Sequence, residues 1–144
     1  GRVWAYLVLV DQVAFALWRI WPHLLLGRVV CVDRYLLDHL VELRFDGLFD
    51  DRAAALFPRL LPVPAVSFVL DVPVELAMER KEDTGEMLDR LDVQVPVEEY
   101  LAERRSLLLE MGERYDARVV DTTGSIVETH EEVHRRALDA YFGS

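Results

Sequence analysis

The chain has 144 residues, enough for about one domain of ordinary size. Hydrophobic residues make up 52% of it, which excludes a generally disordered chain, because disordered chains carry few apolar side chains. The formal net charge of -10 argues against a broad basic surface for nucleic acid, although a few arginines can still hold a phosphate. The single cysteine, Cys31, excludes an internal disulfide and agrees with a reducing, cytoplasmic environment.

The first apolar segment, residues 3–20, predicts a helix that is followed by Pro22 and Gly27. Its apolar run, residues 3–18, is shorter than the roughly 20 apolar residues that cross a bilayer, and Asp11 and Gln12 lie near its middle. We therefore expect a helix of a soluble protein and no membrane span. Because the segment is apolar on nearly every side, it should be deeply buried or form a dimer face.

Three short, β-branched apolar runs predict strands of the kind that parallel sheets bury on both faces. They are residues 29–32, 65–70 and 117–120, followed by Asp33, Asp71 and Asp121. For Asp71 and Asp121, capping of a helix N-terminus is at least as good an interpretation as a role in a site. Cys31 lies inside the first run and is expected to be a small core residue.

Helical segments follow each predicted strand, at residues 36–45, 53–61, 74–81, 96–112 and 126–141. Pro73 suits the first turn of its helix, and Ser125 begins a Ser-x-x-Glu capping box with Glu128. Residues 82–95 are charged and are expected to form a loop or lid. The alternation predicts an α/β fold in a single domain, residues 1–144, with a parallel sheet and flanking helices. Ligands of such sheets bind beyond the carboxyl ends of the strands.

Four segments, in this order, resemble the thymidylate kinase family of P-loop nucleoside monophosphate kinases. They are GRVVCVDRY at residues 27–35, FVLDVPVELAMERK at 68–81, LDRLD at 88–92 and VVDTTGSIVETHEEV at 119–133. A broader thymidylate-kinase-like branch, in which the Asp-Arg-Tyr triplet precedes apolar residues and an aspartate, is the closer resemblance. The resemblance covers most of the chain from Gly27 onward.

The resemblance implies ATP-dependent phosphorylation of a nucleoside monophosphate, dTMP or a related nucleotide, with Mg²⁺. Asp33 would serve the metal, and Arg34 would fork onto the acceptor phosphate, which its planar head suits. Arg80 and Arg90, which flank the lid, would approach the transferring phosphoryl group.

The resemblance also implies residues that bind the two nucleotides. Gln12 would contact the acceptor base, and Tyr35 and Asp38 would belong to the acceptor site. The adenine of ATP would lie against Thr122, Thr123, Gly124, Ser125 and Ile126. Val8 stands where the family usually has an aromatic residue, and Asp38 replaces an expected small hydroxyl residue, so dTMP itself is in doubt.

The phosphate-binding loop of such a kinase is missing. No G-x-x-x-x-G-K-[ST] pattern occurs, and the only lysine is Lys81. Because the donor phosphates need that loop, we expect a portion of a longer protein that is inactive alone. The family's first strand would lie between residues 29–32 and 65–70, so the sheet should have a gap and unpaired edges. We therefore expect a poorly stable or oligomeric chain, and in the family a homodimer.

Two other interpretations stay open. His130-Glu131-x-x-His134 matches the H-E-x-x-H pattern of zinc hydrolases, which also needs a third ligand and an open site. Against it, an apolar stripe should turn the His/Glu face to solvent; its members are Ile126, Val127, Val133, Ala137 and Tyr141. The other alternative is a kinase-derived binding or scaffold domain without activity, because a fold does not fix a function.

Overall fold

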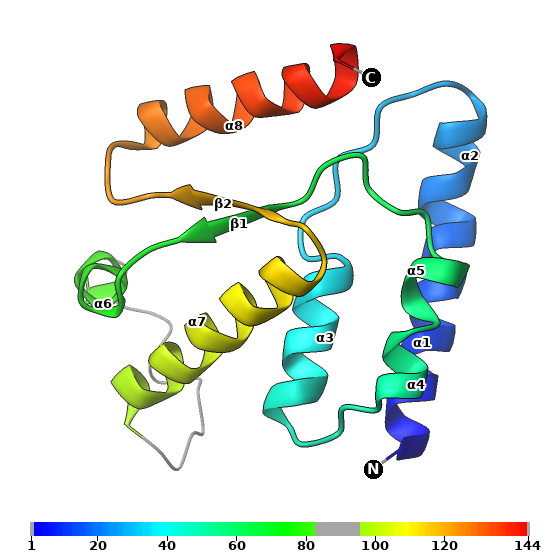
Figure 1. Cartoon of the computed structure of the whole chain (residues 1–144), viewed down its shortest axis with the longest axis horizontal. Helices are drawn as coiled ribbons and strands as arrows, with labels where there is room; N and C mark the ends of the chain where they lie inside the picture. The colour runs from blue at the N-terminus through cyan, green and yellow to red at the C-terminus, as the bar shows by residue number, and fades with distance from the viewer. Residues whose placement is uncertain (1, 83–95, 144) are drawn as a thin grey trace. The chain divides into compact units, whose positions relative to one another are not determined.

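The computed structural model describes residues 2–82 and 96–143 (Figure 1). Where the sequence predicts one domain, the chain divides into two compact units, Gly1–Pro64 and Ala65–Ser144. The predicted lid lies outside the described residues apart from Glu82, and Arg90 lies outside them as well.

The first unit opens with a helix that runs further than the sequence predicts. Helix α1 (Arg2–Phe15) continues through a π-helical turn, η1 (Ala16–Ile20), into α2 (Trp21–Leu25). Pro22 does not end the helix, because it lies in the first turn of α2, where a missing N–H is tolerated. The wider π turn just before it is a usual way to fit such an irregularity into a helix.

Only a narrow stripe of this helix is buried. Its members recur every three or four residues: Ala5, Leu9, Gln12, Ala16 and Ile20. Of the two alternatives expected for this helix, deep burial is wrong, since Trp18 is 82% exposed and Trp4 and Leu25 are also exposed, and a dimer face stays a prediction. By length and composition, Val3–Leu25 is long and apolar enough to cross a membrane, and only 28% of its most apolar window is buried. Most of its apolar surface therefore lies outside the core of the first unit.

The predicted strand at residues 29–32 is wrong. These residues form no strand, and both Val29 and Cys31 are exposed, so Cys31 is not a core residue. A parallel strand exists only with a neighbour to accept and donate its backbone hydrogen bonds. Within the described residues, the only strand pair is in the second unit, so this apolar run stays irregular.

The remaining helices of the first unit build its core. Helix α3 (Leu36–Phe45) is confirmed and ends before Gly47, whose φ of +67° suits glycine. The predicted single helix at residues 53–61 is two short ones, α4 (Asp51–Ala54) and α5 (Phe57–Leu60). Asp50 caps α4 by accepting hydrogen bonds from two backbone N–H groups at 3.0 Å. The largest fully buried side chains of this unit are Phe57, Leu40 and Val41.

The second unit contains a parallel pair of strands. They are β1 (Phe68–Asp71) and β2 (Arg118–Asp121), which confirms two of the three predicted strands, with bounds shifted by one to three residues. The register places Val69 beside Val119 and Asp71 beside Asp121. The two aspartates that end these strands are therefore neighbours at one edge of the sheet.

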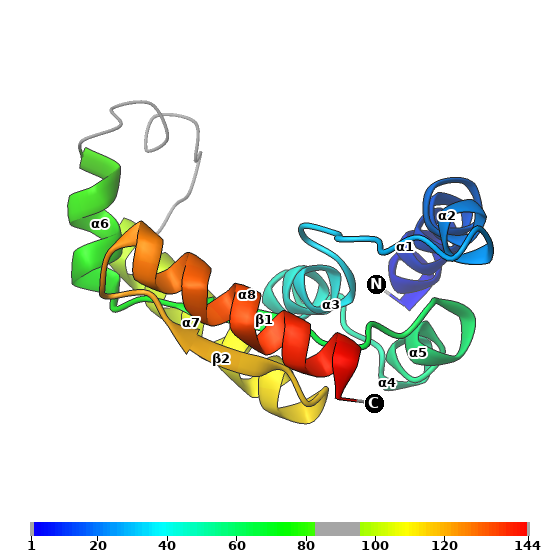
Figure 2. The ribbon, with the colours of Figure 1, turned by 90° about the horizontal axis from the view of Figure 1, so that it is seen from above.

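Helices cover both faces of this pair (Figures 1 and 2). After β1 comes α6 (Val74–Glu82), and α7 (Val97–Arg114) packs on β1 and β2 from one side. Gly112 allows the close approach of α7, because a Cβ there would meet Val69 Cγ2 at 3.0 Å. Helix α8 (Ile126–Phe142) contacts β2 from the other side.

Helix α8 is only loosely covered. None of its residues is fully buried, and Ile126 is 89% exposed. The predicted apolar stripe is therefore wrong as an inward face: Val133 and Ala137 are half-buried, whereas Val127 and Tyr141 are exposed. Helix α8 packs against the sheet at β2. Its half-buried positions cluster on one side of the helix.

Candidate functional site

Hydrogen bonds join the carboxyl ends of the two strands of the second unit. The backbone N–H and the Oγ1 hydroxyl of Thr122 both donate to the carbonyl oxygen of Asp71, each at 2.9 Å. This pairing continues the ladder one residue past β2. The loop after β2 is therefore fixed against the end of β1, the position where parallel sheets bind ligands.

The loop at residues 121–125 is held by its own side chains. The Asp121 carboxylate accepts a hydrogen bond from the Thr123 N–H at 2.8 Å, which lowers the pKa of Asp121. Ser125 and Glu128 form the predicted capping box, confirming it, and the Ser125 N–H lowers the pKa of Glu128. The expectation that Asp121 caps the helix is wrong, because Ser125 caps α8 and Asp121 closes the turn before it.

Arg80 reaches this loop from α6. Its Nη2 donates to the carbonyl oxygen of Thr122 at 2.9 Å and to that of Gly124 at 3.3 Å. Two of the segments implicated by the sequence, the end of the helix before the predicted lid and the predicted adenine loop, therefore meet in one unit. Ile126 follows the loop directly and is almost fully exposed.

Asp71 forms an ion pair that the sequence did not indicate. Arg105 of α7 approaches its carboxylate with two parallel hydrogen bonds, Nε to Oδ1 at 2.6 Å and Nη2 to Oδ2 at 2.8 Å. The hydrogen bond from Arg105 lowers the pKa of Asp71. The N-cap expectation for Asp71 is wrong, since α6 begins at Val74 and the carboxylate faces α7 instead. Nothing in the spacing of α7 sets Arg105 apart from Arg104 beside it.

This pair should make the stability of the second unit depend on acid. Because the folded pKa of Asp71 lies below its unfolded pKa, the pair stabilises above about pH 4 and loses that effect as the pH falls through the folded pKa. We expect Asp71→Asn and Arg105→Gln each to weaken the unit at pH 7 and to matter less at pH 3. Urea unfolding is monitored by far-UV circular dichroism for the unaltered chain, the two single variants and the double variant. Together these four free energies of unfolding give the coupling free energy between Asp71 and Arg105 at each pH. A coupling that is equal at both pH values would contradict it.

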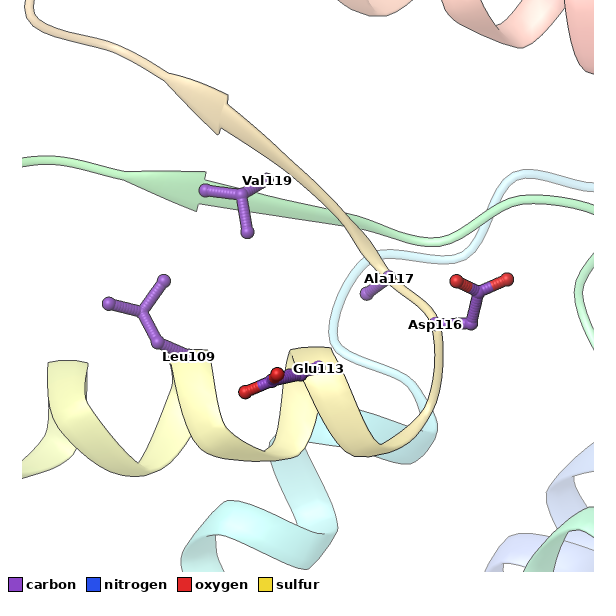
Figure 3. A pocket seen from close by; sticks show the side chains of 5 residues that line it. All are labelled: Leu109, Glu113, Asp116, Ala117 and Val119. Atoms are coloured by element: carbon purple, nitrogen blue, oxygen red, sulfur yellow. The ribbon is translucent and has the colours of Figure 1, made fainter.

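In the part of the chain that the structure describes, a groove beside α7 lies near this edge, and a second one lies away from it. A groove of about 170 Å³ between β1, α6 and α7 has Asp71 and Arg105 among its lining residues. A larger, open groove of about 440 Å³ lies at the other end of β2 and is drawn in Figure 3. Its polar lining is Glu113 and Asp116, so it would repel a phosphate. The larger groove is therefore poorly suited to a phosphate group.

The Asp-Arg-Tyr triplet lies in the first unit, just before α3. Asp33 and Arg34 are exposed, and Arg34 has a φ of +54°, in the left-handed region that a side chain with a Cβ rarely adopts. The Tyr35 hydroxyl donates to the Pro62 carbonyl oxygen at 3.3 Å, and burial raises the pKa of Tyr35. Tyr35 therefore anchors the triplet, and strain is stored at the arginine beside it.

The other acceptor-side residues lie on helices of the same unit. Gln12 belongs to the buried stripe of α1, and its Nε2 is 3.5 Å from Asp11 Oδ2. Asp38 is half-buried in the first turn of α3. The acceptor-side residues thus belong to the first unit, whereas Arg80 and the loop at 122–126 belong to the second.

The described residues offer no ready metal cage. Within residues 2–82 and 96–143, no group of three or more histidine, cysteine, aspartate or glutamate side chains is placed to hold a metal ion. The H-E-x-x-H interpretation therefore finds no third ligand in this part of the chain. Asp33 alone would still suit Mg²⁺, which keeps several waters and takes one or two carboxylates plus substrate phosphates.

Comparison of the chain with protein-family models, with curated proteins and with solved structures gave no match.

Proposed function

We propose that this chain is part of an ATP-dependent nucleoside monophosphate kinase of the thymidylate kinase type. The second unit would bind the adenine of ATP at the loop Thr122 to Ile126, and the first would hold the acceptor phosphate with Arg34. The wider parallel sheet of a P-loop kinase, a cytoplasmic location and a homodimer belong to the same proposal. The observation that carries it is the double hydrogen bond from Arg80 to the loop carbonyls at the carboxyl edge of the sheet.

The loop has few backbone donors left for a base. The N–H groups of Thr122, Thr123 and Ser125 donate to Asp71, Asp121 and Glu128, respectively. Adenine would therefore be held by packing more than by backbone hydrogen bonds. The exposed Ile126 side chain offers an apolar surface beside the loop for this purpose.

In this arrangement Arg80 would contact the adenine of ATP and not the transferring phosphoryl group. A guanidinium held by two carbonyls is fixed in its plane, and its face can stack on an aromatic ring. Arg90, which lies outside the described residues, would keep the role at the phosphates that the resemblance implies.

The acceptor side rests on Arg34. A positive φ at a residue other than glycine costs of order 1–3 kcal/mol and tends to occur where function needs it. With Tyr35 anchored to Pro62, that strain would present the Arg34 fork to an incoming phosphate. The donor phosphates and Mg²⁺ would need a lysine-bearing loop that the sequence lacks, so this chain alone is expected to bind nucleotide without turning it over.

Nucleotide binding to the purified chain tests the proposal. We expect Arg80→Ala to weaken ATP binding about tenfold, equivalent to about 1.4 kcal/mol, measured by titration calorimetry. Arg118→Ala, at the opposite end of β2, is the matched control and should leave binding unchanged. Inorganic tripolyphosphate should bind both variants equally, because the proposed role of Arg80 is toward the base.

Activity needs the longer protein. An ATP-coupled assay of a full-length protein that carries the glycine-rich lysine loop, run against a panel of nucleoside monophosphates, should give turnover with at least one of them. No turnover with any acceptor would overturn the kinase assignment. ATP binding by that inactive protein would then favour the scaffold alternative.

A further inference from the structure

Helix α8 carries two histidines that the proposed kinase does not use. His130 and His134 are one helical turn apart, and their rings stack with centroids 5.8 Å apart and planes inclined by 15°. Both side chains are exposed. The capping box at Ser125 fixes the start of this helix, so the two rings are presented from a regular, well-anchored backbone.

This pair lacks the parts of a zinc hydrolase. A catalytic zinc has three protein ligands and an open position for water, and the described residues supply no third ligand. Glu131, which such a hydrolase would use as its base, is exposed like the two histidines. The match to H-E-x-x-H therefore reduces to its two imidazoles.

We propose that His130 and His134 form a two-ligand surface site for a divalent transition metal of borderline softness. Imidazole suits Cu²⁺, Ni²⁺ and Zn²⁺, and Cu²⁺ should bind most tightly of the three. Stacked rings on one helix face can turn their nitrogens toward a single ion by side-chain rotation, which leaves the backbone unchanged. Water would complete the coordination shell.

The charges nearby do not oppose a cation at this pair. The two arginines that follow, Arg135 and Arg136, both bind the Glu132 carboxylate. Arg135 also lies 3.6 Å from the Asp139 carboxylate. Their positive charge is therefore largely compensated within α8, and the chain as a whole carries a formal charge of -10.

Metal titration of the purified chain tests the site. CuCl₂, NiCl₂ and ZnCl₂ are added separately and followed by calorimetry at mildly alkaline pH, because only neutral imidazole binds metal. We expect one Cu²⁺ site that a chelator empties and that raises the thermal unfolding temperature, since the ion links two positions of one helix. His130→Ala and His134→Ala should each abolish this binding and this thermal shift.

The chain provides its own controls. His23 and His39 are the only other histidines, so His23→Ala and His39→Ala should bind Cu²⁺ like the unaltered chain. Glu131→Gln should also bind normally, because its carboxylate is not a ligand. Binding that survives both His130→Ala and His134→Ala, or that is lost in His39→Ala, would overturn the proposal. Zinc-dependent peptidase activity lost in Glu131→Gln would overturn it in favour of the hydrolase.

Discussion

Replacing Phe57 with alanine should lower the free energy of unfolding of the first unit by about 3–5 kcal/mol. The Phe57 side chain is 0% exposed and is the largest among the fully buried side chains of the described residues. Its removal leaves a cavity in the core of the first unit, which the surrounding structure can fill only in part. Since a whole domain is stable by only about 5–15 kcal/mol, the loss should be large relative to the total.

Tryptophan fluorescence in urea measures this change selectively. All three tryptophans of the chain, Trp4, Trp18 and Trp21, lie in the first unit. Trp18→Ala is the control, because that side chain is 82% exposed and its removal should change stability by no more than about 0.5 kcal/mol. Equal urea midpoints for Phe57→Ala and the unaltered chain would show that Phe57 is not part of a packed core.

Replacing Gly112 with valine should destabilise the second unit by about 1–3 kcal/mol. A Cβ at this position would already stand 3.0 Å from Val69 Cγ2, and the two further methyl groups of valine add bulk next to this contact. Valine is also a better helix former than glycine, by a few tenths of a kcal/mol, so the steric cost has to exceed that gain. Far-UV circular dichroism in urea, or hydrogen exchange of the β1 and β2 amides, would measure the loss.

Two further variants separate the steric effect from helix propensity. Ser106→Val places the same side chain on the exposed face of α7, where we expect a change of no more than about 0.5 kcal/mol. Val69→Ala removes the opposing methyl groups, so the double variant with Gly112→Val should recover part of the loss. If the double variant is as unstable as the sum of the two single ones, the contact between α7 and β1 is not the cause.

The positions of the helices are the part of the fold that the sequence predicts best. Leu36–Phe45 was predicted to the residue, and the helix at 74–81 differs from α6 by a single residue. The Ser125 capping box was also predicted and is present. These features depend on side chains within a few residues of one another, which is the range over which periodicity and capping act.

The strands divide into two cases with one physical cause. The runs ending at Asp71 and Asp121 are strands because each has the other as a partner. The run ending at Asp33 has the same β-branched composition, yet it is irregular and exposed. Composition measures how well a segment fits a sheet, and pairing decides whether the sheet is there.

The candidate site shows the same division. The sequence alone determined which loop follows β2, which arginine lies near the end of α6 and which two histidines share one turn of α8. Only the tertiary structure decided that Arg80 binds the carbonyls of Thr122 and Gly124, and that Arg105 pairs with Asp71. These pairs are 34 to 44 residues apart along the chain. At such separations, contact depends on how the strands and α7 pack together. Local sequence patterns carry no information about that packing.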